Sequence, residues 1–86
     1  MIAAKVIDNI WSTRKAESLR GLKLMIVEVL DDKAAVSRLI AADVIGAGIG
    51  ERVLVTTGSA ARRMVGDDNI PVDAVIVGII DEDCTF

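Results

Sequence analysis

The sequence predicts a mainly β protein, a small closed or partly open barrel of five strands with one short helix between the fourth and the fifth. Three observations support this prediction. Short apolar segments recur along the chain, separated by polar or glycine-containing turns, as is typical of strands. One segment instead has the start and end signals of a helix. The length of 86 residues is expected to give a single domain over residues 1–86.

Alternating polarity predicts the first two strands. Residues 2–11 place apolar side chains between polar ones, which indicates a half-buried strand. Residues 12–21 are polar and charged and are expected to form an exposed loop. Residues 22–30 form the second predicted strand, and the segment Asp31-Asp32-Lys33 has the composition of a turn. One face of the second strand carries Met25, Val27 and Val29.

The third element is ambiguous from composition alone. Residues 34–43 contain enough alanine and leucine for a helix, but the segment is short and lies between strand-like sequences. We therefore predict a strand over residues 37–43. A fourth strand is predicted over residues 52–57, which contain valine, leucine and threonine.

The short helix is predicted over residues 60–65, with Ser59 capping its first amides and Gly66 ending it. Residues 67–71 form a loop, because the residue before a proline resists helical geometry. The fifth strand, residues 74–80, is apolar on both faces. A small barrel covers only the inner face of such a strand, so we expect the outer face to need a neighbouring chain.

Composition and charge narrow the class of partner. Hydrophobic residues make up 52% of the chain, and a domain of this size hides only roughly 60% of its unfolded surface, which favours an oligomer over an apolar-rich monomer. The net charge of −3 argues against binding to nucleic acid or to an anionic membrane surface. No apolar run approaches the ~20 residues that span a bilayer. The single cysteine, Cys84, fits a reducing cytoplasm.

A glycine-rich motif, Gly46-Ala47-Gly48-Ile49-Gly50-Glu51, lies between the third and fourth predicted strands. It departs from the dinucleotide-binding fingerprint, because its third glycine comes one residue early and it leads into a strand. We interpret it as a tight connection in which glycine permits positive φ and close backbone approach. In an oligomer such a turn can lie near a symmetry axis.

The start of the predicted helix is a second candidate site. Its free amides could hold an anion with the help of Arg62 or Arg63, but a helix capped by Ser59 with solvated arginines is the favoured interpretation. Arg62 could instead pair with an acidic group of a neighbouring subunit.

Catalytic, cofactor and metal sites are not expected. The chain has no histidine to act as a base for a serine or for Cys84. The carboxylate pairs Asp31/Asp32 and Asp67/Asp68 fall in predicted turns, where solvation is expected. The acidic run Asp81-Glu82-Asp83 is interpreted as a solvated tail rather than a metal cluster.

Two stretches together resemble the EutN/CcmL family, the pentameric vertex proteins of bacterial microcompartments. They read G-A-G-I-G-E-R-V-L-V-T-T-G-S-A-A-R, and then P-V-D-A-V-I-V-G-I-I-D. The resemblance extends over nearly the whole chain and includes K-L-M-I-V-E-V-L in the second strand. Residues 31–35 and the C-terminus depart from the family pattern, which leaves the compartment type open.

The resemblance implies a five-stranded barrel related to the OB fold, five copies of which form a truncated pyramid. Such homopentamers occupy the vertices of a cytoplasmic protein shell whose facets are hexameric shell proteins. It thus implies a structural protein whose partners are itself and those hexamers. The implied rim or subunit-contact turn consists of Gly46, Ala47, Gly48, Ile49, Gly50 and Glu51. The implied contact at the helix start consists of Ser59 and Arg62.

Two other functions remain open from the sequence. The chain could be a small barrel that binds an anionic ligand at the glycine turn and at Ser59 and Arg62. It could also be an oligonucleotide-binding barrel, although its acidic, aromatic-poor composition lacks the stacking platforms that such barrels use.

Overall fold

The computed structural model describes residues 1–30, 35–66 and 69–86. The predicted turn at Asp31-Asp32-Lys33 and the pair Asp67/Asp68 lie outside the described residues. The predicted strands and the predicted helix lie within them and can be compared with the structure. The elements are β1 (Ile2–Ile10), η1 (Glu17–Leu19, a 3-10 helix), β2 (Lys23–Val29), β3 (Arg38–Asp43), β4 (Arg52–Thr57), α1 (Ser59–Met64) and β5 (Ala74–Ile79). The five predicted strands are confirmed to within one or two residues at each end.

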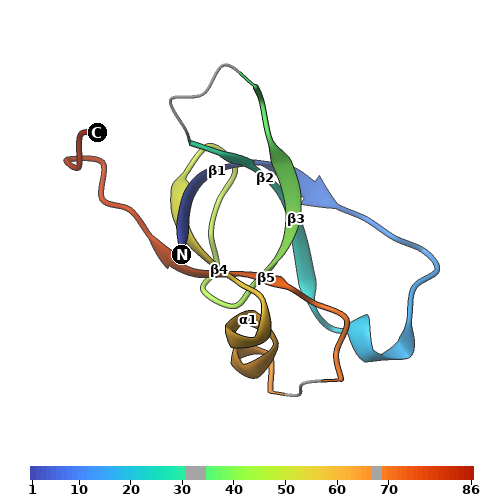
Figure 1. The fold of residues 1–86 in the computed structure, drawn as a ribbon. Coiled ribbons are helices and arrows are strands. Elements are labelled where there is room, and N and C mark those ends of the chain that lie inside the picture. Colours follow the sequence, from blue (N-terminus) through green and yellow to red (C-terminus); the bar gives the residue numbers. More distant parts are fainter. Residues whose placement is uncertain (31–34, 67–68) are drawn as a thin grey trace.

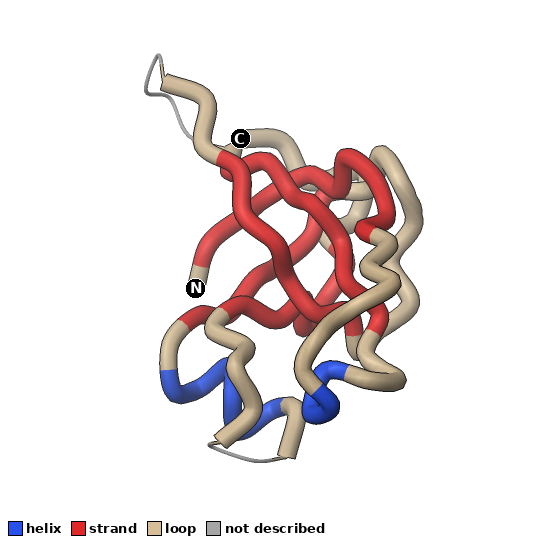
Figure 2. Tube along the Cα trace, turned by 90° about the vertical axis from the view of Figure 1, so that its right-hand side faces the viewer, coloured by secondary structure: helices blue, strands red, loops and turns tan. Residues whose placement is uncertain are grey.

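Within the described residues the strands close into a barrel in the order β1-β2-β3-β5-β4 (Figure 1). Neighbouring strands are antiparallel, except that β3 and β5 run parallel. The helix α1 lies between β4 and β5 in the chain and outside the ring of strands. Figure 2 shows α1 and η1 on the same side of the barrel.

Two register shifts interrupt the alternation that the sequence predicts. One lies in the β1–β2 pair between Val6 and Asp8, and the other in the β4–β5 pair between Leu54 and Val55. An extra residue in one strand bends it and increases its twist, which a small closed barrel requires. The alternation expected for residues 2–11 is therefore interrupted after Val6, and tight closure is the physical reason.

The barrel interior is filled with small and β-branched side chains. Val27, Val53, Val55 and Ile76 are fully buried there, and Met25 is the unbranched side chain that joins them. The remaining buried members of this inner cluster are Ala4, Val6, Ala41, Ala47 and Ala74. Of the three residues predicted to share one face of the second strand, Met25 and Val27 are buried and Val29 is half-buried.

A second buried cluster lies outside the ring, beneath the helices. Ala61 of α1 packs with Val75 of β5, Ala42 of β3 and Val72, all with 7% or less of their surface exposed. Leu19 of η1 is partly buried against the same cluster. The expectation that the outer face of β5 needs a neighbouring chain is therefore wrong for Val75, which the chain covers with its own helix. The loop at 12–21 is exposed as predicted except at Leu19.

The start of α1 differs from the prediction. Gly58 is the N-cap residue, with φ +70°, and Ser59 is the first helical residue and makes no capping hydrogen bond. The Gly58 amide donates to the Asp73 carbonyl at 2.9 Å, so a backbone bond to the segment before β5 fixes the entrance to the helix. The helix ends at Met64, one residue before the predicted end, and Val65 and then Gly66, with φ +98°, follow it.

Truncation of the inner cluster tests this packing. We expect Ile76→Ala to lower the free energy of unfolding by about 2–5 kcal/mol, because a fully buried side chain leaves a cavity that the closed barrel cannot collapse. The control Val36→Ala, at a residue 69% exposed, should change it by less than about 0.5 kcal/mol. Denaturant unfolding at one fixed protein concentration measures both, and equal effects would contradict the assignment of the core.

Candidate functional site

The glycine turn connects β3 to β4 and covers one end of the barrel. In Figure 1 it crosses the opening of the ring of strands. Ala47, in the middle of the turn, is 1% exposed and belongs to the inner cluster. The turn therefore contributes the Ala47 side chain to the barrel core, and its other residues lie on the outer side of the turn.

Asp43, the last residue of β3, holds the first half of the turn. Its carboxylate accepts hydrogen bonds from the backbone amides of Ile45 and Gly46, both at 3.0 Å, and of Ala47 at 2.9 Å. The side chain is fully buried and forms an ion pair with Lys23 at 3.6 Å. Sequence reasoning missed this residue, although an aspartate three residues before a glycine is a known turn signal.

The second half of the turn is fixed by Glu51 and by β1. The Gly48 amide donates to the Glu51 carboxylate at 2.6 Å. The Gly50 amide donates to the Val6 carbonyl at 2.8 Å, and the Val6 amide donates to the Glu51 carbonyl at 2.9 Å. Gly46 and Gly50 both have positive φ, as the sequence interpretation requires.

These hydrogen bonds decide what the turn can bind. A phosphate-binding loop needs backbone amides that point at the ligand without partners. Here the amides of residues 45–48 and 50 already donate to acceptors within the chain, and two carboxylates occupy the positions that an anion would take. The turn is therefore a rigid structural element and is poorly suited to an anionic ligand.

The outward side of the turn is apolar. Val44, Ile45 and Ile49 are 42%, 48% and 59% exposed, respectively. Because the backbone between them is fixed by the bonds described above, these side chains are held in place without a covering layer. Such a surface suits packing against another protein.

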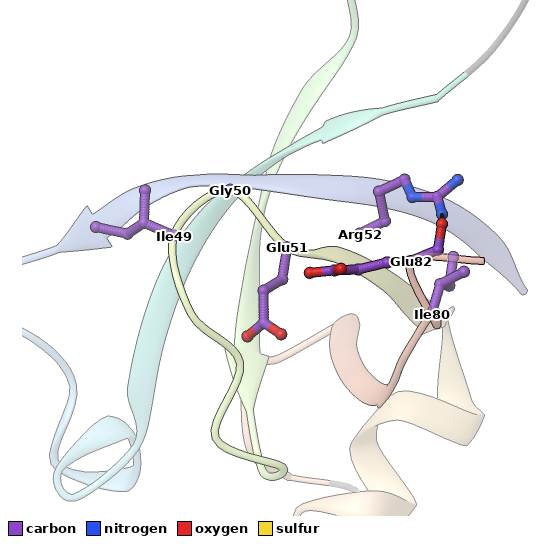
Figure 3. A pocket seen from close by; sticks show the side chains of 6 residues that line it. All are labelled: Ile49, Gly50, Glu51, Arg52, Ile80 and Glu82. Carbon is purple, nitrogen blue, oxygen red and sulfur yellow. Dashed lines mark hydrogen bonds between the residues drawn. The ribbon is translucent and has the colours of Figure 1, made fainter. Parts of the chain in front are cut away.

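A hollow of about 330 Å³ lies between the turn and the segment after β5. Figure 3 shows the Glu51, Arg52, Ile80 and Glu82 side chains around it, while Ile49 points away from them. Its charged groups are two carboxylates and one guanidinium, and that guanidinium is already bound to backbone carbonyls. Ser59 and Arg62, the other predicted site residues, do not line this hollow.

Arg52 organises the C-terminal segment. Its Nη2 donates to the carbonyls of Asp81 at 2.9 Å, Cys84 at 2.6 Å and Glu82 at 3.5 Å, and its guanidinium lies 4.9 Å from the centre of the Phe86 ring. The acidic side chains are exposed, as the sequence predicts. The sequence did not predict that the backbone of this segment is folded against β4 through Arg52.

The folded segment forms one wall of an apolar groove of about 470 Å³. Strand residues from β1, β4 and β5 form the rest of it. The groove is lined by Ala3, Leu54, Ile79, Ile80, Asp81, Cys84 and Phe86. Leu54, Ile79 and Phe86 are 37%, 40% and 75% exposed, so this part of the outer barrel surface lacks the helical cover that Val75 has.

At the helix start, Ser59 is exposed and Arg62 is half-buried. Arg62 and Arg63 lie in the last turn of the six-residue helix, where positive charge complements the helix dipole. Neither arginine forms an ion pair with another described residue. Across residues 1–30, 35–66 and 69–86, no group of three acidic, cysteine or histidine side chains is placed to hold a metal ion. Nor does this part of the chain contain a helix long and apolar enough to cross a membrane.

Comparison with known proteins gives consistent matches. Residues 1–81 match the family described as ethanolamine utilisation protein EutN/carboxysome. The carboxysome shell vertex protein CcmL of Synechocystis sp. is 48% identical over 83 residues, which cover 94% of this chain and 83% of that protein. The bacterial microcompartment shell vertex protein PduN of Salmonella typhimurium is 38% identical, over 94% of this chain and 96% of that protein. The solved structure of the GrpN pentameric microcompartment shell protein from Rhodospirillum rubrum superposes with a TM-score of 0.82 at 39% identity and covers 100% of both chains.

Removal of the Asp43 carboxylate tests its role in the turn. We expect Asp43→Ala to lower the free energy of unfolding by about 3 kcal/mol, because three amides lose a charged acceptor and Lys23 loses its partner. Hydrogen exchange at the amides of residues 45–47 should accelerate. The matched control Asp73→Ala removes an exposed carboxylate and should leave both quantities nearly unchanged. Unaltered exchange in Asp43→Ala would show that the turn is held by other contacts.

Proposed function

Because this chain belongs to the EutN/CcmL family, we propose that it is a structural shell protein that forms the pentameric vertices of a bacterial microcompartment in the cytoplasm. The family is structural rather than enzymatic. Relatives come from carboxysomes and from other microcompartments, so the proposed function is the vertex function that they share. We propose residues 1–86 as one vertex domain.

The apolar outer surface of the barrel carries this proposal. The helices cover one side of the ring, but large apolar side chains remain exposed on the strands and on the glycine turn. They include Ile40, Val44, Ile45, Ile49, Leu54 and Ile79. Covering such surface stabilises an assembly by roughly 25 cal/mol per Å². A ring of five copies gives each copy two different contact faces, which is enough to cover apolar surface on both sides.

The partners follow from the proposed position in a shell. A pentamer closes a vertex where five facets meet, so its outer edge would contact the hexameric shell proteins of those facets. Within the pentamer we propose the glycine turn as the rim of the axial opening or as a subunit contact. Ile49 is the turn residue whose exposed side chain fits this position, whereas the Ala47 side chain is committed to the barrel core. Ser59 and Arg62 are proposed as a further subunit contact, because the Arg62 guanidinium has no acidic partner among the described residues.

The anion-binding alternative is less well supported. Its two proposed elements were free amides in the glycine turn and at the start of α1. The turn amides are occupied by Asp43 and Glu51, and the arginines lie in the last turn of α1 rather than its first. A carboxylate beside the site would also repel a bound anion.

Measurement of the mass in solution tests the proposed assembly. We expect sedimentation equilibrium at micromolar concentration to give a species with five times the 9.1 kDa mass of the chain. A chain that stays monomeric or dimeric at high concentration would contradict the proposal, because the apolar outer surface would then be stable without a partner.

Cross-linking tests the position of the glycine turn. In a Cys84→Ser background, we expect Ile49→Cys to form covalently linked dimers on mild oxidation, because turns around a five-fold axis bring equivalent residues together. The matched control is Val36→Cys, another exposed apolar position that lies outside the turn. Pentamers that show no more cross-linking through residue 49 than through residue 36 would remove the turn from the rim and leave the pentamer itself intact.

A further inference from the structure

Trp11 is the most exposed large hydrophobic side chain in the described part of the chain, at 89%. It lies immediately after β1, at the start of the loop that leads to η1. Tryptophan is enriched at the energetic centres of protein interfaces, where its large apolar area is buried and its N–H finds a partner. Its 89% exposure in a single copy leaves this side chain available to another molecule.

The loop that carries Trp11 is positively charged. Arg20 forms an ion pair with Glu17 at 2.6 Å, but Arg14 and Lys15 form no ion pair with any described residue. The loop also has internal hydrogen bonds. The Ser12 hydroxyl donates to the Arg14 carbonyl at 2.8 Å, and the Lys15 ammonium donates to the Ser12 carbonyl at 3.1 Å. These bonds limit the conformational entropy that the loop would lose on binding.

The apolar groove lined by Leu54, Ile79 and Phe86 carries negative charge at its edge, opposite in sign to the charge of the Trp11 loop. Its wall is the segment that Arg52 folds back. Asp81 of this segment lines the groove and the exposed Asp83 follows it, whereas Glu82 lines the hollow beside the glycine turn. Within the described residues none of the three forms an ion pair. The groove thus offers apolar surface inside and carboxylates without ion-pair partners in its wall, which complements an indole on a loop that carries Arg14 and Lys15.

The Trp11 loop and the groove cannot meet within one chain. Figure 1 shows the loop after β1 on the right of the barrel and the C-terminal segment on the left. Contact between them therefore joins two copies head to tail, which is the type of contact that closes into a ring. Each copy supplies one loop and one groove, so every loop in a ring finds a groove.

We propose that Trp11 of one copy inserts into the Leu54–Ile79–Phe86 groove of the next copy, with Arg14 and Lys15 facing the carboxylates in its wall. This inference rests on the proposed homopentamer and names the two surfaces that join its subunits. Arg52 is then a positioning residue, because it builds the groove wall without touching the incoming side chain. A second copy is the occupant because both halves of the contact, matched in polarity and in charge, lie on this one sequence.

The test uses Trp11 as its own reporter, because the chain has a single tryptophan. Emission and acrylamide quenching are measured on the full chain, with sedimentation equilibrium on the same samples. We expect a blue-shifted emission maximum and several-fold weaker quenching in the pentamer than in the diluted subunit. Trp11→Ala should weaken assembly by about thirtyfold or more. The control Val36→Ala, also at an exposed apolar residue, should not.

A charge exchange identifies the partner surface. The double variant Arg14→Glu/Lys15→Glu places like charges opposite the carboxylates of the groove wall and should weaken assembly at least tenfold, more so at low salt. Adding Asp81→Lys and Asp83→Lys should restore assembly and the blue-shifted emission. This recovery requires contact between copies, because the two charge sets lie on opposite sides of one chain (Figure 1).

Each result decides between distinct conclusions. A pentamer whose Trp11 remains exposed to acrylamide overturns the inference and leaves the proposed function standing. If the unmodified chain is a pentamer but the exchanged charges fail to restore assembly, the inference is also overturned, because the Trp11 loop then faces a different surface. Burial of Trp11 only when a hexameric shell protein is added would assign it to that partner instead. Absence of any pentamer contradicts the proposed function itself.

Discussion

The narrow interior of a five-stranded barrel is the constraint on which the rest of this structure depends. The inner cluster is made of alanine and valine with only Met25 and Ile76 as larger side chains that are fully buried. A chain with 52% hydrophobic residues contains far more apolar surface than such a lumen can hold. The excess apolar surface has to lie on the outside of the ring. Helices cover it on one side of the ring, and it stays exposed on another.

On one side the chain covers its own surface. The helix α1 places Ala61 over Val75 and Ala42, and η1 adds Leu19 on the same side of the barrel. On the other side β1, β4 and β5 present a groove that is open to partners, with a wall formed by the segment after β5. One arginine, Arg52, connects this wall to the barrel through backbone carbonyls and the Phe86 ring. The result is a subunit with unlike sides, which a head-to-tail ring requires.

The glycine turn shows how the chain closes one barrel end without exposing unsatisfied backbone groups. Asp43 and Glu51 accept most of its amides, and Ala47 fills the core beneath it. The same bonds that make the turn rigid also remove its capacity to bind phosphate. A rigid turn with apolar side chains on its outer surface is suited to pack against another protein. This agrees with the structural function of the family.

The sequence by itself determined the five strands, the single short helix and the glycine, Gly66, that follows that helix. These features depend on local patterns of polarity and on glycine, which are readable residue by residue. Only the tertiary structure decided the register shifts at Val6 and Leu54, the role of Asp43 and the position of the C-terminal segment on Arg52. Ser59 was predicted as the helix cap because serine is a common N-cap residue. In the structure Gly58 is the N-cap, held by the hydrogen bond from its amide to the Asp73 carbonyl, and the helix begins one residue earlier than predicted. Each of these features depends on closure of the barrel or on groups distant in sequence, and local pattern carries no information about which distant groups will meet.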